Sequence, residues 1–431
     1  QTHRMRVAVF LTACLAIAAA TPFQSFTSAP TNGKKWALLI AGSNTWGNYR
    51  HQADIYHSYQ IMKAGGLADE NIVVMHYDDI ANSDENPAKG TVINSPTGSD
   101  VYHGVPKDYT GADVSATNFL AVLKGDKAAV NGKKVIASGP NDEVFVYFAD
   151  HGGPGILGMP EGEPFLYAKD VVEALKEKAA NNGFKQLVFY IEACESGSIF
   201  ENTLPDNIKI YATTAANAQE SSWGCYCPGM ASPPPAGYNT CLGDLYSVAW
   251  MENTDKAGRM ESFEKQYQLV KNRVSQNGTF TQGSHVMQYG ELDFDNEDLD
   301  VFMGDTAAED ILPAGNVGGI NNRDANLIHL GLKNPAELAS EIARRQEMDS
   351  RMVRLATLLA GKEDAHAITT EIRTPVVEDW DCYKGNFEAY IAACGKVGDY
   401  GMKHGRTMAN LCNAGVKTSQ VAAAAKLICS A

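Results

Sequence analysis

The stretch Lys185–Ser198, KQLVFYIEACESGS, decides the fold assignment. Its apolar, β-branched and aromatic run predicts a buried strand, and ESGS predicts the turn that ends it. Cys194 therefore stands at the carboxyl end of a strand. Reactive groups of open α/β sheets collect at that edge because the strands hold the following loops rigid. The question is what a lone cysteine does between Glu192 and Glu195.

Strands and helices alternate on both sides of this stretch. Short apolar runs predict strands, and amphipathic runs that end in glycine predict helices. The expected strands are WALLIAGSN (36–44), NIVVMHYDD (71–79), DEVFVYFADHGG (142–153) and IKIYATTA (208–215), and the expected helices are HQADIYHSYQIMKAGG (51–66) and KDVVEALKEKAANNG (169–183). This alternation predicts an α/β fold with a mostly parallel sheet flanked by helices.

A second strand end carries a histidine. His151 lies in FADHGGPG (148–155), directly before two glycines. An imidazole beside Cys194 would lower the pKa of the thiol and later protonate a leaving amine. The N–H groups around Gly152 and Cys194 would form an oxyanion hole. Asn48, after the first strand, is the candidate that fixes the imidazole tautomer.

Each of these residues also has a plainer interpretation. A single strand-end cysteine or histidine is more often a buried structural side chain, and the nucleophile hypothesis rests on finding both together. Zinc is a poor explanation because no pair of candidate ligands has the usual spacing and glutamates flank the thiol. We therefore expect neither a metal nor a cofactor.

The first 22 residues predict a signal peptide and leader. Arg4 and Arg6 precede the apolar run Val7–Ala20, which is too short to span a bilayer and ends in small residues. Cleavage is expected near Ala20. No later run approaches the length of a membrane helix, so we expect a protein of the secretory pathway without a membrane partner.

The remaining chain divides into a core, a linker and a tail. We expect an α/β core over 33–304, then an exposed linker over 305–330, because the Gly-, Asn- and Asp-rich segment 304–325 lacks apolar periodicity. From 331 to 431 helical spacing predicts a small all-helical domain. Its four cysteines allow three disulfide pairings, and a Cys227–Cys241 bridge would fix the Pro-rich loop between them.

The charge of the chain limits its partners. The formal net charge is −15, and it resides in the first 330 residues, since the tail is nearly balanced. An acidic body argues against a nucleic-acid partner. It also favours pairing with a less acidic segment, a pairing that weakens as carboxylates protonate, although an acidic surface kept for solubility explains the charge equally well.

Long motifs resemble the legumain family, the asparaginyl endopeptidases, and most closely its plant-type members. The motifs are GNYRHQADIYHSYQ (47–60), YDDIA (77–81), GVPKDYTG (104–111), DHGGPG (150–155), YIEACESGSIF (190–200), TCLGDLYSVAWMEN (240–253) and GSHVMQYG (283–290). The resemblance implies a caspase-like fold and a cysteine peptidase that cleaves after Asn. It also implies a latent zymogen that is activated in an acidic vacuole or lysosome, with secretion as the alternative destination.

The resemblance also assigns roles to residues. It makes Cys194 the nucleophile, His151 the acid and base, and Asn48 the support of His151. It makes five residues the specificity pocket: Arg50, His51, Glu192, Ser221 and Asp244. An amide side chain offers an acceptor and donors, so a guanidinium on one side and carboxylates on the other pair both of its ends. Asp is expected as a substrate residue only at acidic pH.

In the tail, the resemblance implies a prodomain that inhibits the core, with bridges Cys382–Cys412 and Cys394–Cys429. It implies self-cleavage in the linker after one of five residues: Asn316, Asn321, Asn322, Asp324 or Asn326. A dimer of the proenzyme is a further partner that the resemblance allows. Asn277 in NGT is the sequon with an acceptable middle residue. Cys225 is left without an obvious partner.

The alternative activities start from the same thioester. Some plant-type relatives join peptides, and in this family a bulky gatekeeper after SSW favours ligation. Gly224 stands at the gatekeeper position, and Glu163 stands near the side of the site where the leaving peptide would bind. Both residues favour hydrolysis. A GPI-transamidase-like subunit would share the His and Cys motifs but would need a membrane anchor. A non-enzymatic binding module would make Cys194 dispensable. The expected partners remain peptides and proteins with exposed Asn.

Overall fold

The computed structural model describes residues 33–160, 164–257, 261–294, 296–304 and 317–430. The predicted signal peptide, Glu163 and Asn316 lie outside the described residues.

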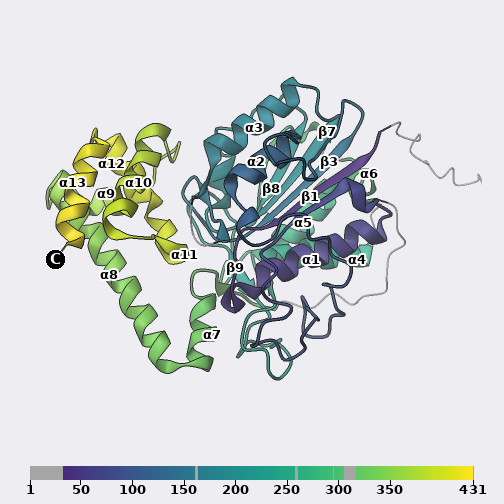
Figure 1. Ribbon diagram of the computed structural model, residues 1–431, viewed down its shortest axis with the longest axis horizontal. Coiled ribbons are helices and arrows are strands. Elements are labelled where there is room, and N and C mark those ends of the chain that lie inside the picture. The colour runs from purple at the N-terminus through teal and green to yellow at the C-terminus, as the bar shows by residue number, and fades with distance from the viewer. Residues whose placement is uncertain (1–32, 161–163, 258–260, 295, 305–316, 431) are drawn as a thin grey trace, which may run out of the picture. The chain divides into compact units, whose positions relative to one another are not determined.

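A six-stranded sheet forms the centre of the core (Figure 1). Its strands, in spatial order, are β11 (Met287–Gly290), β8 (Ile210–Thr214), β7 (Gln186–Glu192), β3 (Glu143–Ala149), β1 (Lys35–Ala41) and β2 (Ile72–Met75). β11 pairs antiparallel with β8, and the other neighbours are parallel. The predicted mostly parallel α/β sheet is confirmed.

Helices cover both faces of this sheet (Figure 1). Because successive side chains of a strand point to opposite faces, Phe145 and Tyr147 of β3 enter one apolar cluster, and Val144 and Val146 enter the other. The first cluster includes residues of α1 (Tyr49–Ala64), α4 (Leu245–Ala257) and α5 (Phe263–Val274). The second includes residues of α2 (Ala116–Lys124) and α3 (Ala168–Ala180). All residues of β3 and β7 are buried, as expected of central parallel strands.

Two small antiparallel sheets lie after the strand ends. One is β4 (Gly152–Gly153), β5 (Ile156–Leu157) and β6 (Leu166–Tyr167), which follows β3. The other is β10 (Gly243–Asp244), β9 (Trp223–Cys225) and β12 (Ile320–Asn321). A Cys227–Cys241 disulfide closes the predicted loop beside β9.

The C-terminal region is helical, as predicted. Its helices are α7 (Ala325–Lys333), α8 (Pro335–Ala360), α9 (Ala365–Thr370), α10 (Trp380–Cys394), α11 (Gly398–Gly401), α12 (Gly405–Asn413) and α13 (Thr418–Cys429), and α6 (Asp300–Met303) ends the core. The Asn334 side chain accepts from the Ala336 N–H and so caps α8 before Pro335. The Cys382–Cys412 and Cys394–Cys429 bridges are both present.

The structure differs from the predicted exposed linker. Within that segment Val317 and Asn322 are buried and β12 pairs with β9, so the part from 317 to 325 belongs to the folded core. The tail boundary predicted at 331 cuts through α7, which begins at Ala325. Strand addition of this kind depends on a partner strand far away in sequence, and local composition does not reveal it.

Candidate active site

The carboxyl ends of β3 and β7 bring His151 and Cys194 to one edge of the sheet. The two strands pair in parallel, with Ala149 opposite Glu192, and each site residue follows two positions later. Both side chains are buried. Gly152 packs directly on the Cys194 backbone, where a Cβ would lie 2.2 Å from the Cys194 carbonyl oxygen. A side chain at 152 would therefore force the two strand ends apart.

Asn48 fixes the orientation of the imidazole. It ends a 3₁₀ turn, Trp46–Asn48, and its Oδ1 lies 2.8 Å from His151 Nε2. Its amide nitrogen lies 3.2 Å from Asp399 Oδ2, and because a carboxylate accepts, this contact sets which end of the amide faces the ring. Nε2 of His151 therefore donates to Asn48, and Nδ1 remains the basic nitrogen of the neutral ring.

Burial favours the neutral form of both the His151 and the Cys194 side chain. Burial lowers the pKa of His151 to about 4, against the opposing influence of Asp399. Burial also raises the pKa of the Cys194 thiol, although Arg323 nearby lowers it. Thiol and imidazole are therefore both neutral, and a neutral thiol is a weak nucleophile.

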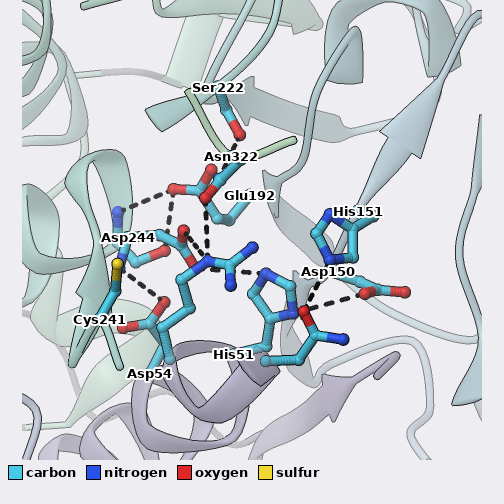
Figure 2. A network of polar contacts seen from close by, with 12 residues as sticks. His51, Asp54, Asp150, His151, Glu192, Ser222, Cys241, Asp244 and Asn322 are labelled. Atoms are coloured by element: carbon cyan, nitrogen blue, oxygen red, sulfur yellow. Dashed lines mark hydrogen bonds and ion pairs between the residues drawn. The ribbon is translucent and has the colours of Figure 1, made fainter. Parts of the chain in front are cut away.

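A polar pocket lies beside the pair, and an asparagine side chain of this same chain fills it (Figure 2). Nε of Arg50 donates to Asn322 Oδ1 at 2.9 Å and to Asp244 Oδ1 at 2.9 Å. Asn322 Nδ2 donates to the Ser222 hydroxyl at 2.8 Å. Both ends of one carboxamide are thus paired, by a cation at the oxygen and by an acceptor at the nitrogen.

Glu192 lies close to Ser222, the residue that binds the amide nitrogen. Burial raises the pKa of Glu192 well above its usual range, and the nearby Ser222 hydroxyl, which accepts from Asn322, acts against this shift. Glu192 Oε2 accepts from the Ser247 N–H at 3.2 Å and hydroxyl at 3.1 Å. Among the described residues, Arg50 Nη2, Glu192 Oε1 and Asp244 Oδ2 have no hydrogen-bond partner.

Comparison with known proteins identifies the two parts of the chain. The model of the Peptidase C13 family matches residues 35–305, and the model described as legumain, prodomain, matches residues 336–429. The chain belongs to the Peptidase C13 family.

Among its relatives, the "Vacuolar-processing enzyme" of Vicia sativa is 47% identical, over 92% of this chain and 86% of that protein. The "Vacuolar-processing enzyme beta-isozyme" of Arabidopsis thaliana is 48% identical, over 92% and 86%. The "Legumain" of Canavalia ensiformis is 45% identical, over 92% and 89%. A crystal structure of caspase-1 from Spodoptera frugiperda is similar with a TM-score of 0.37 and 12% identity, over 65% of this chain and 96% of that one.

The segment that enters the C13 site forms a strand beside it. β12 pairs antiparallel with β9, with Ile320 opposite Gly224 and Asn321 opposite Trp223, and the Asn322 N–H donates to the Ser222 carbonyl at 3.0 Å. A Cβ on Gly224 would lie 3.0 Å from Asn322 Oδ1. Extended peptides are commonly recognised by such strand addition, with pockets for alternate side chains.

The serine that bonds the Asn322 amide is not the one named in the sequence analysis. The Ser221 hydroxyl accepts from Arg323 Nη1 at 3.3 Å, and it is the next residue, Ser222, that bonds the amide. Neighbouring residues of an extended segment face opposite ways, so a shift of one position exchanges their roles. Arg50, His51, Glu192 and Asp244 do gather at the pocket, all fully buried.

The legumain prodomain lies over the catalytic edge. Asp399 Oδ2 approaches His151 Nε2 to 3.4 Å, and the Tyr383 hydroxyl donates to the Pro154 carbonyl. The glycines after His151 make this approach possible. A Cβ on Gly153 would lie 2.3 Å from the Met402 carbonyl oxygen.

A buried ion pair extends this cover to Cys194. Arg323, the residue after Asn322, pairs with Glu195, and both side chains are 8% exposed. The Arg323 guanidinium also donates to the Gly152 carbonyl at 3.4 Å. This ion pair beside Cys194 and Asp399 beside His151 thus lie over the two candidate residues.

Within the described residues, one cluster has atoms that could ligate a cation. His51, Asp150 and His151 place ligand atoms within 4.8 Å of one another. Each ring already has one nitrogen engaged, His51 Nδ1 with Ser43 at 2.6 Å and His151 Nε2 with Asn48. We therefore assign these residues to the peptidase site. The two free cysteines of the described chain are Cys194 and Cys225.

The remaining site predictions stay untested. The oxyanion hole at Gly152 and Cys194 and the gatekeeper role of Gly224 are of this kind. The Asn277 side chain is exposed, as a glycan acceptor requires. No helix of the described residues is long and apolar enough to cross a membrane.

Proposed function

We propose that this protein is a cysteine endopeptidase that cleaves after Asn, made as a latent zymogen. The observation that carries the proposal is the Asn322 carboxamide in the pocket beside Cys194, held by Arg50 at its oxygen and Ser222 at its nitrogen. A pocket that pairs both ends of the asparagine of its own chain has the chemistry to select the same side chain in a substrate.

Catalysis follows from the tautomer that Asn48 imposes. The Cys194 thiol passes its proton to His151 Nδ1 as sulfur bonds to the substrate carbonyl carbon. The C–N bond then breaks, the amine leaves with that proton, and a thioester remains. Water adds to the thioester and returns a proton through His151, which releases the acid and restores the thiol.

The pocket discriminates through desolvation. All of its charged groups are buried, so a substrate side chain without an amide leaves Arg50 or a carboxylate unpaired, at a cost of about 1–3 kcal/mol or more for each group. An ionised Asp would meet the Glu192 and Asp244 carboxylates. Cleavage after Asp is therefore expected only under acidic conditions.

Latency is proposed to come from the prodomain and its preceding segment. Asn322 occupies the pocket, Arg323 pairs beside Cys194, and Asp399 lies against His151. Self-cleavage after Asn322 is the most direct of the predicted activation cuts, since Asp324 pairs with Arg345 and Asn326 lies within α7. The names of the relatives support a vacuolar or lysosome-like acidic compartment, reached through the secretory pathway.

Hydrolysis is proposed over ligation, because Gly224 adds no side chain to the pocket wall. The matched legumain prodomain argues against the GPI-transamidase alternative.

The test is mass spectrometry of acid-activated protein at pH 5 and pH 7, with a peptide containing one internal Asn and an amine-bearing acceptor. Free acid after Asn at both pH values supports a peptidase, and a joined product dominating at pH 7 identifies a ligase. Cleavage that persists in Cys194→Ala would overturn the assignment.

A further inference from the structure

Behind the pocket lies a buried carboxyl that touches no substrate atom. Asp54, on α1, is fully buried, as is Asp244 in front of it. The Asp244 N–H donates to Asp54 Oδ2 at 3.3 Å, which places the Asp54 carboxyl directly against the backbone of Asp244. Two ionised carboxylates that neighbour each other in a fully buried site repel strongly, so the pair is expected to hold one proton.

Asn94 and His57 fix the far side of Asp54. Asn94 Nδ2 donates to Asp54 Oδ1 at 2.7 Å and to the Leu242 carbonyl at 2.9 Å. Asn94 Oδ1 faces His57 Nδ1 at 2.9 Å, and His57 Nε2 faces Asp255 Oδ2 at 2.8 Å. Both ring nitrogens of His57 thus face acceptors. Asp54 cannot turn away from Asp244 without breaking this chain of hydrogen bonds.

The charges around the pair also require a proton. Three fully buried carboxyls, Asp54, Asp244 and Glu192, meet one guanidinium, that of Arg50. Burial raises the pKa of Asp54, and the Asp244 charge raises it further. The other charged or titratable groups around the pair lie on several elements: Arg50, His51 and, through Asn94, His57 on α1, Tyr147 on β3, Asp150 after β3, Glu192 on β7 and Cys225 on β9.

We propose that Asp54 is a specificity-determining positioning residue: it holds Asp244 and shares one proton with it, and this proton sets the pH range in which the pocket accepts Asp as well as Asn. The inference rests on the proposed asparaginyl activity. With the proton present the pair carries one negative charge and tolerates an acidic side chain. Once the proton is lost, the two adjacent anions repel the acidic side chain of an Asp substrate, whereas the neutral amide of an Asn substrate is still bound.

The test compares two peptides that differ only in Asn or Asp at the cleaved position. kcat and KM are measured from pH 4 to pH 8 for acid-activated wild type and for Asp54→Asn, in which an amide donor replaces the shared proton. Glu143→Gln is the matched control, because Glu143 is a buried acid at the opposite end of β3, paired with Lys185.

In Asp54→Asn, the pH at which cleavage after Asp falls to half is expected to rise by about one pH unit. The Asn-over-Asp ratio of kcat/KM at pH 7 is expected to fall about tenfold, and the Asn peptide to show a change mainly in KM. Equal loss for both peptides with an unmoved pH midpoint would overturn the proposal, since a merely structural role predicts that result.

Two further measurements cover an Asp54→Asn variant that does not fold and a wild type that is inactive. If Asp54→Asn does not fold, Asn94→Ser is measured instead. It removes the donor to Asp54 Oδ1, so the pair should keep its proton to higher pH and the Asp midpoint should rise. An unmoved midpoint there overturns the proposal. Wild type that cleaves neither peptide would instead overturn the proposed function itself.

Discussion

The Arg50 Nε–H donates to both the Asp244 carboxylate and the Asn322 amide oxygen. A lysine ammonium on a flexible stem does not reproduce this geometry. We predict that Arg50→Lys lowers kcat/KM for Asn peptides about 100-fold, equivalent to about 2.7 kcal/mol. Arg273→Lys is the control, because Arg273 pairs with Glu252 at 2.8 Å away from the pocket. Equal losses in both variants would remove Arg50 from specificity.

Gly224 leaves room for the amide. An added methyl would lie 3.0 Å from the asparagine oxygen and 3.5 Å from Arg50 Cδ, so Gly224→Ala should crowd the pocket wall. We predict a KM for Asn peptides about 3–10-fold higher, with kcat little changed, from steady-state kinetics. Gly139→Ala, where a Cβ meets nothing within 4 Å, should match wild type. An unchanged KM in Gly224→Ala would contradict the position given to Asn322.

At the scale of elements, α8 anchors the segment that covers His151. Asp349 on α8 accepts from the Tyr400 hydroxyl at 2.8 Å and from His404 Nε2 at 2.9 Å, and pairs with Lys403 at 3.0 Å. Burial raises the pKa of Asp349, but the hydrogen bonds from His404, Tyr400 and Lys403 outweigh it and hold the pKa well below its usual range. Asp399, against His151, lies next to these partners.

The pKa of Asp349 is lowered in the folded state. Its ionised carboxylate therefore stabilises the closed chain above the ordinary pKa of Asp, and this stabilisation is lost as the pH falls through the lowered pKa. Wild type keeps this contribution at pH 5. We predict that in Asp349→Asn the prodomain uncovers Cys194 at a higher pH than in wild type. Alkylation of Cys194, followed by intact-mass analysis, measures this pH. Glu347→Gln, on the exposed side of α8, should behave as wild type. Identical opening curves would contradict the anchoring role.

At the scale of the whole molecule, we predict that buried histidines make release of the prodomain depend on acid. Burial lowers the pKa of His151 from 6.5 to about 4, and burial also lowers that of His404. An open form would bind protons that the closed form excludes. The contribution of His151 to closure is therefore present above pH 6.5 and is lost as the pH falls through about 4, and His404 acts in the same direction. We predict a rise in alkylation of Cys194 within this range. Opening on raising the pH would contradict the account.

The sequence predicted the features that depend on local pattern, namely the strands of the sheet and the residues at their ends. Apolar runs at strand spacing placed His151 and Cys194 at neighbouring strand ends, and the family resemblance supplied the disulfide pairs. β12 was missed because Gly- and Asn-rich segments read as loops and its pairing is tertiary. Asp54 was missed because an acid within a helix reads as a surface charge when its burial is unknown. Ser222 was missed by one position.

The central claim is that the pocket beside Cys194 selects an asparagine side chain. The most direct measurement is kcat/KM of the acid-activated protein on two peptides identical except for Asn or Gln at one position, with product masses identified. The account predicts cleavage after Asn at least about 100-fold faster than after Gln, absent in Cys194→Ala, because the longer amide misplaces its bonds to Arg50 and Ser222. Equal rates on the two peptides would contradict it.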